Sequence, residues 1–437
     1  MSNKLKFILL FLALYAFRTL YGLCHSFFSP DELQTYLIGL KWYCHGGWPY
    51  FGPDLIVTET GFYSQIPGPL EAWMVGYPLV IWAIPEAPFL FLNFFSTGAI
   101  ALLAWYLSKR LPQMPFLFLF AWIALLPWNL HESTNPINPS YLLMGSTLFF
   151  IGFLEAIPSF SKDYLPPAVA FGMMGFGLFW DMQFHSAWVL LPPFVLLAFA
   201  LRLRDKHFHF MHDFVAFWLG SLPMVAILLP TYLKYGPDQG AGGFHLMQAF
   251  NLANFLSFFT VLLRFLSLPC HEVIRFLNAP GQLHHLDMLK DRFLWLWPGF
   301  VLIPIGWFQA LSLLVMGWFK DEAYPEGRTL SKIVLFAFLL VWGSFCFSSK
   351  EPWAHIYYIL MPLLVVYSLY IWNRWASHPV MRRLALACLA ASVWFQAAYA
   401  LHVMKTQSLY TDRALVQKAI QEKNEHLLGE RRPGALY

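Results

Sequence analysis

Long hydrophobic segments alternate with short polar stretches along almost the whole chain. A helix needs about 20 mainly apolar residues to cross a membrane, and twelve segments of this sequence approach that length. A thirteenth, 249–268, is weaker because it carries Asn251, Asn254 and Arg264. The pattern predicts an all-α polytopic membrane protein whose strong segments are residues 7–23, 69–84, 87–107, 114–130, 139–157, 164–180, 187–203, 213–232, 293–319, 332–347, 356–372 and 384–404.

The composition supports a membrane protein. Of the 437 residues, 58% are hydrophobic and only 12% are charged, whereas an ordinary soluble domain has about 25% charged residues. Aromatic residues reach 19%, as expected where many segment ends lie at membrane interfaces. The net charge of +4 is small, and the basic residues form no patch suited to nucleic acid.

The distribution of Lys and Arg decides which segments cross. Cytoplasmic loops carry an excess of these residues, so the N-terminus with Lys4 and Lys6 is placed in the cytoplasm. If segment 69–84 crossed, two of the later basic loops would fall outside. If it instead lies along the outer interface, every basic loop falls inside, namely those with Lys109 and Arg110, Lys162, Arg202, Arg204 and Lys206, Lys320, Arg328 and Lys332, and Arg374, Arg382 and Arg383.

We therefore predict about eleven transmembrane helices plus a juxtamembrane helix in the first outer loop. Segment 69–84 has only 16 residues and contains Glu71. Segment 249–268 is also predicted not to span, because counting it would reverse the last basic loops. Segment 7–23 resembles a signal peptide in its basic start, but no small-residue cleavage site follows, so we interpret it as an uncleaved first span.

This topology predicts one transmembrane domain over residues 1–404 and a short extracytoplasmic tail over residues 405–437. Residues 413–428 are expected to form an amphipathic helix that lies on the membrane or packs on the outer loops; its apolar residues are Leu415, Val416, Ile420 and Leu427. The outer loops are residues 24–86, 131–138, 234–292 and 348–355, joined by the short turn 181–185.

Two adjacent carboxylates, Asp31 and Glu32, follow the first span directly. Pro30 cannot continue a helix, and Pro-Asp-Glu is a favourable start for a new one. Carboxylates at a membrane boundary are costly unless they are solvated or used, so they indicate a functional site. The alternative is an acidic first turn that only caps the helix. Cys24 and Cys44 flank this stretch and could pair in an oxidising compartment, or both remain thiols.

The sequence contains no P-loop, dinucleotide fingerprint or HExxH motif. The neighbouring pairs His271-Glu272 and His284-His285 lack the spacing of metal ligands. The sequence indicates no certain cofactor and leaves open whether a divalent cation is needed.

The outer loops resemble those of the GT-C glycosyltransferases, in the branch of bacterial relatives of protein O-mannosyltransferases and lipid A aminoarabinose transferases. The family pattern is Asp-Glu after the first span, a helix, a Gly-Asp-Trp-like turn and Pro-Pro-Leu-Tyr-Tyr-Trp on a juxtamembrane helix. Here Asp31-Glu32 is followed by Gly-Gly-Trp-Pro-Tyr at 46–50 and Gln-Ile-Pro-Gly-Pro-Leu-Glu-Ala-Trp at 65–73. A late stretch, 350–362, resembles the family's Lys, His, Tyr-Tyr and Pro pattern, and the whole resemblance covers roughly residues 1–200 and 345–365.

The resemblance implies transfer of a sugar from a polyprenyl-phosphate carrier to a lipid, glycan or protein acceptor on the outer face, with inversion. Asp31 is then the general base and Glu32 orients it or binds the acceptor. Lys350 or His355 holds the leaving phosphate, with Lys290 and Arg292 as alternatives. The further substrate-binding candidates are Trp42, Glu59, Gln65, Asn138 and Tyr357.

Some of these residues depart from the family or have simpler explanations. Gln65 stands where the family often has Lys, His or Glu, and Asn138 replaces an acidic residue, so Glu59 is a second carboxylate only by proximity. Asn138 can instead start the next helix. Lys350 can be an interfacial snorkelling residue. The aromatic and His candidates can equally be membrane-interface anchors.

Two other classes of protein compete with the transferase. A transporter or flippase for a lipid-linked sugar would need ionisable residues at mid-membrane, and Asp181 is the best candidate although it lies near a segment end. A non-catalytic protein of envelope-glycan assembly would not need Asp31. The charges gather on the outer loops, which favours surface chemistry in an integral protein of a bacterial inner membrane.

Overall fold

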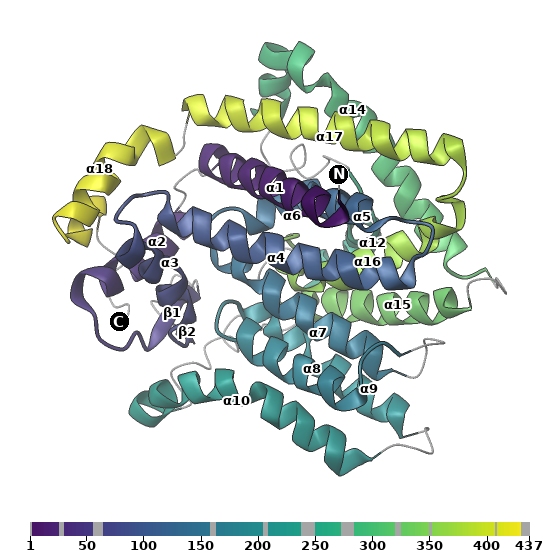
Figure 1. The fold of residues 1–437 in the computed structure, drawn as a ribbon, viewed down its shortest axis with the longest axis horizontal. Coiled ribbons are helices and arrows are strands. Elements are labelled where there is room, and N and C mark those ends of the chain that lie inside the picture. Colours follow the sequence, from purple (N-terminus) through teal and green to yellow (C-terminus); the bar gives the residue numbers. More distant parts are fainter. Residues whose placement is uncertain are drawn as a thin grey trace.

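The computed structural model describes residues 2–25, 30–55, 64–157, 163–203, 209–236, 250–271, 284–319, 325–348, 352–406 and 409–429. Helices dominate these ranges, which confirms the predicted all-α class (Figure 1). Long helices lie side by side, and the small elements that follow α1 gather at one end of the bundle.

The longer helices are α1 (Asn3–His25), α4 (Ala87–Arg110), α7 (Leu142–Ala156), α8 (Pro167–Asp181), α10 (Phe210–Tyr235), α14 (His284–Met316), α15 (Glu326–Phe345) and α17 (Pro379–Thr406). The shorter helices are α2 (Pro30–His45), α3 (Leu70–Ile81), α5 (Phe116–Ala124), α6 (Pro127–Ser133), α9 (Pro192–Arg202), α11 (Leu252–Leu256), α12 (Phe258–Ser267), α16 (Met361–Trp372) and α18 (Leu409–Gln421). Single 3₁₀ turns are η1 (Asn138–Tyr141), η2 (Ser186–Leu190), η4 (Tyr358–Leu360), η5 (Asn373–Trp375) and η6 (Glu425–Leu428).

Six helical segments in the described part of the chain are long and apolar enough to cross a membrane. They are Asn3–His25, Ala87–Arg110, Asn138–Ala156, Phe210–Tyr235, Glu326–Phe345 and Pro379–Lys405. Most of the other predicted spans occur as shorter helices, so the hydrophobic segments overstate how continuous the helices are.

Proline explains where several predicted spans break. Segment 114–130 divides into α5 and α6 because Pro127 stands in the first turn of α6, where its missing N–H is not needed. Pro192 in α9 and Pro362 in α16 likewise stand at helix starts, each after a 3₁₀ turn. Such breaks are tolerated at membrane depth where the backbone is buried in protein, and residues 124–136 are mostly buried.

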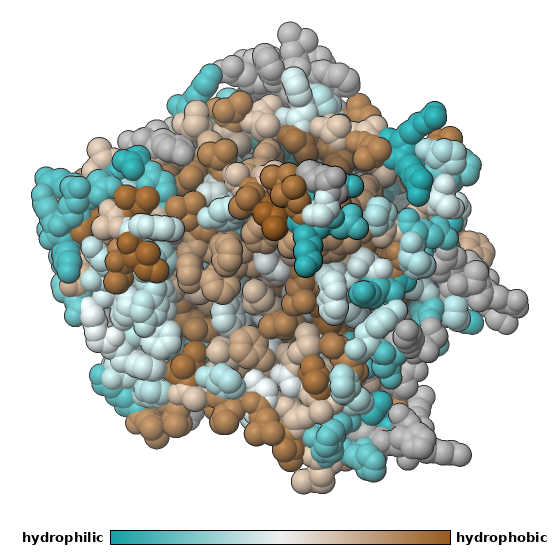
Figure 2. All heavy atoms as spheres, in the orientation of Figure 1, coloured by the Kyte–Doolittle hydropathy of each residue, from teal (hydrophilic) through white to brown (hydrophobic). Residues whose placement is uncertain are grey.

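The basic helix ends lie together at one end of the bundle. Arg110 at the end of α4 pairs with Glu155 at the end of α7, and its guanidinium lies 4.6 Å from the ring centre of Tyr164. Arg202 at the end of α9 lies 3.7 Å from Asp213 at the start of α10. Figure 2 shows hydrophilic residues at two opposite sides and hydrophobic residues between them, as expected for a membrane-embedded bundle.

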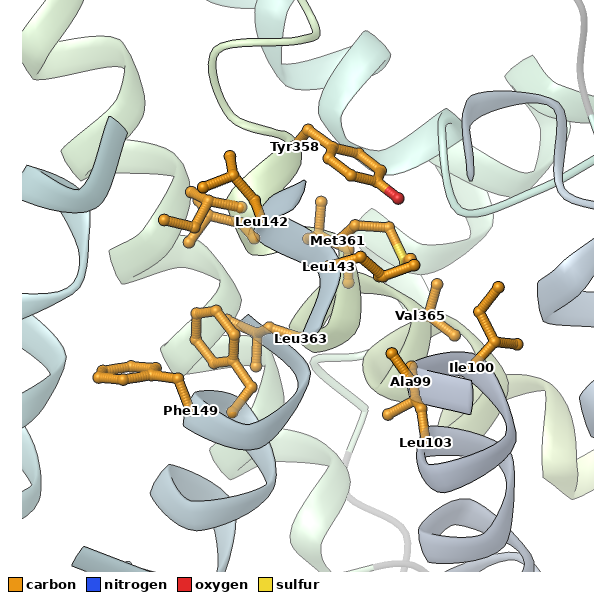
Figure 3. Packing of buried hydrophobic residues seen from close by; sticks show 14 of the residues in the cluster. Ala99, Ile100, Leu103, Leu142, Leu143, Phe149, Tyr358, Met361, Leu363 and Val365 are labelled. Carbon is orange, nitrogen blue, oxygen red and sulfur yellow. The ribbon is translucent and has the colours of Figure 1, made fainter. Parts of the chain in front are cut away.

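The core is built around α16, the helix that is buried on all sides. Nearly every residue from Met361 to Ile371 is buried, and a helix that is apolar all round belongs in the centre of a bundle. Met361 and Val365 lie among side chains of α4 and α7, including Leu103 and Leu143 (Figure 3). This packing places the start of α16, with its Tyr-Tyr pair, inside the protein.

Helices α8 and α10 meet backbone to backbone through glycines. A Cβ atom added to Gly220 would lie 2.0 Å from the carbonyl oxygen of Gly172, and one on Gly175 would lie 2.1 Å from a carbonyl oxygen of α10. Small residues allow such close approach between membrane helices. At the far end of α10, the Thr231 hydroxyl donates to the carbonyl oxygen of Tyr50 at 2.9 Å, so α10 supports the first outer loop.

The predicted first outer loop, residues 24–86, contains a small hairpin that the sequence did not predict. Strands β1 (Phe51–Leu55) and β2 (Ser64–Pro67) are antiparallel, with Phe51 opposite Pro67. Helix α2 ends just before two glycines with positive φ, 67° and 85°, which redirect the chain into β1. Helix α3 has 12 residues, about 18 Å. It is too short to span, as the charge distribution predicted.

Helix α18 and turn η6, together the C-terminal clasp, pack on the first outer loop. The helix begins at Leu409, before the predicted start. Val416 and Ile420 are buried as predicted, whereas Leu415 is 44% exposed and points away. The clasp therefore packs on the outer loop, one of the two predicted arrangements.

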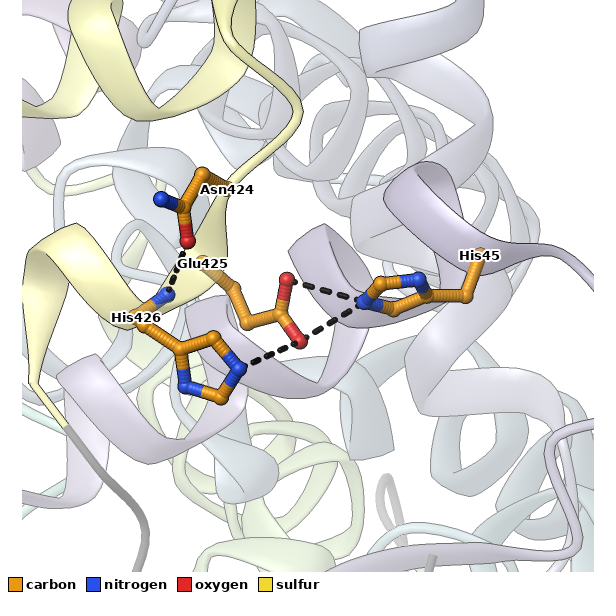
Figure 4. Close-up of polar contacts among 4 residues, drawn as sticks. All are labelled: His45, Asn424, Glu425 and His426. Atoms are coloured by element: carbon orange, nitrogen blue, oxygen red, sulfur yellow. Dashed lines mark hydrogen bonds and ion pairs between the residues drawn. The ribbon is translucent and has the colours of Figure 1, made fainter.

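Three polar contacts hold the clasp. Arg413 forms an ion pair with Glu86, which precedes α4. The Gln417 amide donates to the carbonyl oxygen of Ala83 at 3.0 Å. Glu425 lies 2.9 Å from Nε2 of His45 at the end of α2 (Figure 4). The tail therefore joins the end of α2 to the segment that precedes α4.

Glu425→Gln is expected to lower the free energy of unfolding by about 0.5–1 kcal/mol near neutral pH, because His45 is largely exposed and the pair is screened. Burial alone would raise the pKa of Glu425, but a backbone hydrogen bond and His45 outweigh it and lower the pKa. A lowered folded pKa gives stability that is present above the unfolded pKa and lost as the pH falls through the folded value.

Thermal unfolding of both proteins at pH 4 and pH 7 would measure this contribution. The difference between them should shrink toward about pH 4 and below, where the carboxyl group of the wild type becomes protonated. The exposed Glu422, 52% accessible, provides the matched control Glu422→Gln. An equal difference at both pH values would contradict the role given to the ionised carboxylate.

The two outer cysteines are thiols in this structure. Sγ of Cys24 lies 3.6 Å from Sδ of Met404, and Cys44 is half-buried beside the clasp. Burial, assisted by the charge of Glu425, raises the pKa of Cys44 to about 11, which makes its thiol unreactive at neutral pH.

Candidate active site

The predicted acidic motif lies at the start of a helix, as expected. Helix α2 begins at Pro30, so Asp31 and Glu32 occupy its first turn. The side chain of Asp31 lies outside the described residues. Glu32 is 4% exposed and therefore points into the protein. A carboxylate buried to this degree needs hydrogen-bond donors.

The Asn135 amide is one donor to Glu32. Its Nδ2 atom lies 3.1 Å from Oε1 of Glu32 and also 3.1 Å from Nδ1 of His25, the last residue of α1. His25 and Asn135 are as buried as Glu32. The ring of His131, on α6, lies edge-on to His25 with the ring centres 4.6 Å apart. The distant segment 131–135 thus meets the end of α1 and the start of α2 at Glu32.

Close backbone packing positions Asn135. The Asn93 side chain of α4 donates to the carbonyl oxygen of Thr134 at 3.1 Å. On the other side, Gly22 of α1 approaches that oxygen so closely that an added Cβ atom would lie only 2.3 Å away. Glycine is required here for the close approach. Residue 135 is therefore fixed against α1, where it reaches both partners.

A second buried carboxylate, Glu71, lies against the same helix. The Thr35 hydroxyl, one turn after Asp31 on α2, donates to Oε1 of Glu71 at 2.7 Å. Glu71 is fully buried in the first turn of α3. Sequence analysis used this residue only as evidence against a span. An acid in an otherwise apolar segment was the available signal that it has a function.

Asp181 ends α8 and is completely buried. Neither of its carboxylate oxygens has a hydrogen-bond partner in the described part of the chain. Four residues later, the His185 ring approaches the His355 ring, with the ring centres 6.4 Å apart. This places His355, a predicted phosphate ligand, next to the turn that follows α8.

Two predicted substrate-binding residues have clear packing roles. The Trp42 indole donates to the carbonyl oxygen of Gly47 at 3.0 Å, and its ring packs edge-on against Tyr77 of α3 at 4.6 Å. Trp42 therefore ties the end of α2 to α3. Gln65 is buried on β2, 3% exposed.

Asn138 and Tyr357 have different surroundings. Asn138 opens η1, which agrees with the alternative that it starts the next helix. Tyr357 is fully buried, with its ring centre 5.7 Å from that of Phe265 and 6.1 Å from that of Trp128. Its neighbour Tyr358 donates to Oδ1 of Asn129 at 2.6 Å, a contact that sequence analysis missed.

Several predicted site residues are not described. Glu59 and Lys350 lie outside the described residues, as do the side chains of Lys290 and Arg292. Within the described residues, no group of three or more His, Cys, Asp or Glu side chains is arranged to hold a metal ion.

Comparison with known proteins identifies the fold. No family model matches the chain, and no curated protein sequence matches it. The structure is similar to that of ArnT from Cupriavidus metallidurans bound to undecaprenyl phosphate, with a TM-score of 0.50 and 9% sequence identity over 98% of this chain and 78% of that chain. The apo state of ArnT gives a TM-score of 0.49 and 12% identity over the same shares.

At such low identity, the likeness defines the fold and nothing finer. The chain is an integral membrane protein with a GT-C fold, and the resemblance inferred from the outer-loop motifs is confirmed at that level. The aminoarabinose transferase ArnT is the particular structure to which it is similar.

Proposed function

We propose that this protein is a glycosyltransferase that moves a sugar from a polyprenyl-phosphate carrier to an acceptor at the outer face of a bacterial inner membrane. The N-terminus is then cytoplasmic, and the first outer loop and the C-terminal tail are extracytoplasmic. One observation carries the proposal: in a GT-C fold, two adjacent carboxylates open the helix that follows the first long apolar helix.

The chemistry of such a transfer suits this position. The carrier's apolar tail lies in the lipid and its phosphate at the interface, so the reacting sugar must meet the acceptor near the ends of the helices. The carrier is a lipid of the same class as the undecaprenyl phosphate bound to ArnT. Lipid, glycan and protein acceptors all supply the hydroxyl or amine that this reaction needs.

We assign the general base to Asp31, which takes the proton of the acceptor as its oxygen or nitrogen attacks the anomeric carbon. Single displacement breaks the bond between that carbon and the carrier phosphate and inverts the anomeric centre. Glu32 orients the acceptor, and Glu71 is a further acidic candidate because Thr35 holds it against α2. Lys350 or His355 stabilises the leaving phosphate with a charge-assisted hydrogen bond.

Deletion of the gene is the first test. Mass spectrometry of surface glycolipids, glycans and polyprenyl-phosphate sugars should show one sugar missing from an acceptor while its carrier-linked form accumulates. A transporter of the lipid-linked sugar would also lose the product. A second assay distinguishes the transferase from the transporter. The accumulated donor and an extract of acceptors are added to purified protein in detergent, where there is no membrane to transport across. Product formation supports the transferase, and its absence from an active preparation contradicts it.

A further inference from the structure

Glu32, Asn135 and His25 form a linked polar triad in the interior of the protein. The three side chains are 4%, 2% and 1% exposed. The amide nitrogen of Asn135 is 3.1 Å from the Glu32 carboxylate and 3.1 Å from Nδ1 of His25. The side chains come from the start of α2, the segment after α6 and the end of α1.

The hydrogen-bond chemistry favours one protonation state of this arrangement. An amide nitrogen carries two hydrogens and accepts none, so Asn135 donates one to each partner. Nδ1 of His25 accepts only in the neutral imidazole, with its proton on Nε2. A carboxyl oxygen accepts whether or not the group is protonated, but it accepts more strongly when ionised, so the hydrogen bond from Asn135 favours the ionised form of Glu32.

The opposite orientation of the amide requires a different set of protons. If the side-chain oxygen of Asn135 faced both partners, Glu32 and Nδ1 of His25 would each have to carry a proton. When Glu32 gains one proton on the oxygen that faces Asn135, the amide of Asn135 turns over and the proton of His25 moves from Nε2 to Nδ1. The net change is a single proton gained at Glu32, so the triad has two self-consistent states.

We propose that Asn135 and His25 are positioning residues that hold Glu32 ionised and couple its protonation to the tautomer of His25. The catalytic role of this arrangement rests on the proposed function. In that function, Glu32 orients the acceptor or the base Asp31, and it must be ionised to do so. The coupling itself is a property of the protein without substrate.

Other titratable and charged groups lie on the elements that form the triad and on the helices that contact them. The His25 ring stacks on Tyr21 of α1 at 5.2 Å and lies 5.3 Å from the ring of Tyr399 on α17. The remaining groups are Arg18, two turns before His25 on α1, Asp31, which precedes Glu32 in the sequence, His131 and Glu132 on α6, and Glu71, which Thr35 links to α2.

Infrared difference spectroscopy on the full-length protein in lipid nanodiscs, titrated over pH without any substrate, tests the coupling. The carboxyl band of Glu32 is the one that disappears in Glu32→Gln. Asn135→Ala and His25→Phe are each expected to move the midpoint of this band to higher pH, by about one unit. His25→Gln, whose side-chain oxygen can accept in place of Nδ1, is expected to restore much of the wild-type midpoint.

Glu422→Gln, far along the exposed face of the clasp, is the control and should leave the band unchanged. If Asn135→Ala does not fold, Asn135→Ser and His25→Phe provide the same test. An unchanged midpoint in folded variants overturns the proposal, as does an equal shift in His25→Phe and His25→Gln. No donor or acceptor is needed, so this result is independent of whether the protein proves to transfer sugar.

Discussion

Asp31→Asn is expected to lower the rate of sugar transfer by about 10²–10⁴-fold, the usual contribution of a general base. The amide keeps the size of the side chain and its place in the first turn of α2 but cannot take a proton from the acceptor. Binding of the carrier lipid, which depends on other groups, should change little. The loss should therefore appear mainly in kcat.

Surface glycans and carrier lipids of cells that express equal amounts of wild-type and variant protein would provide the measurement. Asp31→Glu, which restores a carboxylate one methylene further out, should recover part of the activity. Glu422→Gln, an exposed acid on the same side of the molecule, should have none of this effect. If Asp31→Asn complements a deletion fully, Asp31 only caps α2, and the transporter or assembly interpretation gains support.

Arg18→Ala is expected to lower the free energy of unfolding by about 3 kcal/mol or more, because it removes several buried, charge-assisted hydrogen bonds at once. Arg18 lies within α1 and is fully buried. Its guanidinium donates to the carbonyl oxygen of Ala124 at 2.9 Å and to the Ser133 hydroxyl at 2.7 Å. A charge inside a membrane segment persists where it faces the bundle and finds such acceptors.

The Arg18 contacts continue as a network toward α16. The Ser133 hydroxyl lies 3.0 Å from Oδ1 of Asn129, which also accepts from the Tyr358 hydroxyl at 2.6 Å. Tyr358→Phe removes only the far end of this network and is expected to cost about 1 kcal/mol. The network therefore links the helix before the acidic motif to the segment that carries His355.

Thermal unfolding in detergent, followed by circular dichroism, would compare these variants with Leu12→Ala. Leu12 lies on the same helix but is 54% exposed, so its truncation should have little effect in detergent. A wild-type melting temperature for Arg18→Ala would show that water or lipid compensates for the lost contacts. It would also rule out the network as a main support of the bundle.

The hydrophobic pattern predicted the helical class, the distribution of Lys and Arg predicted the non-spanning α3, and the Pro-Asp-Glu motif predicted the helix that starts at Pro30. Lipid offers no hydrogen bonds to the backbone, so an apolar segment long enough to cross the membrane forms a helix, which satisfies its own backbone groups. Proline and adjacent acids are local signals that act within one turn. The topology could be predicted from the distribution of Lys and Arg, because each basic loop affects the orientation of its neighbouring helices independently of the contacts in the folded protein.

The candidate site shows where sequence reasoning stopped. Asp31-Glu32 was recognised from its local motif, whereas the donor to Glu32 lies 103 residues further along the chain at Asn135. Glu71 was visible as an acid in an apolar segment, but only the packing of α3 on α2 brings it to Thr35. The hairpin β1–β2 was missed because two short strands have no signal that distinguishes them from a loop.

The sequence by itself thus determined the class of the protein, its main helices and the position of its acidic motif along the chain. The tertiary structure decided where the helices break, which elements the C-terminal clasp packs against and which residues contact Glu32. These depend on contacts between segments far apart in sequence, such as Gly22 against Thr134 and His45 against Glu425. The free energy of such contacts comes from both partners together, so neither segment alone carries a pattern that reveals them.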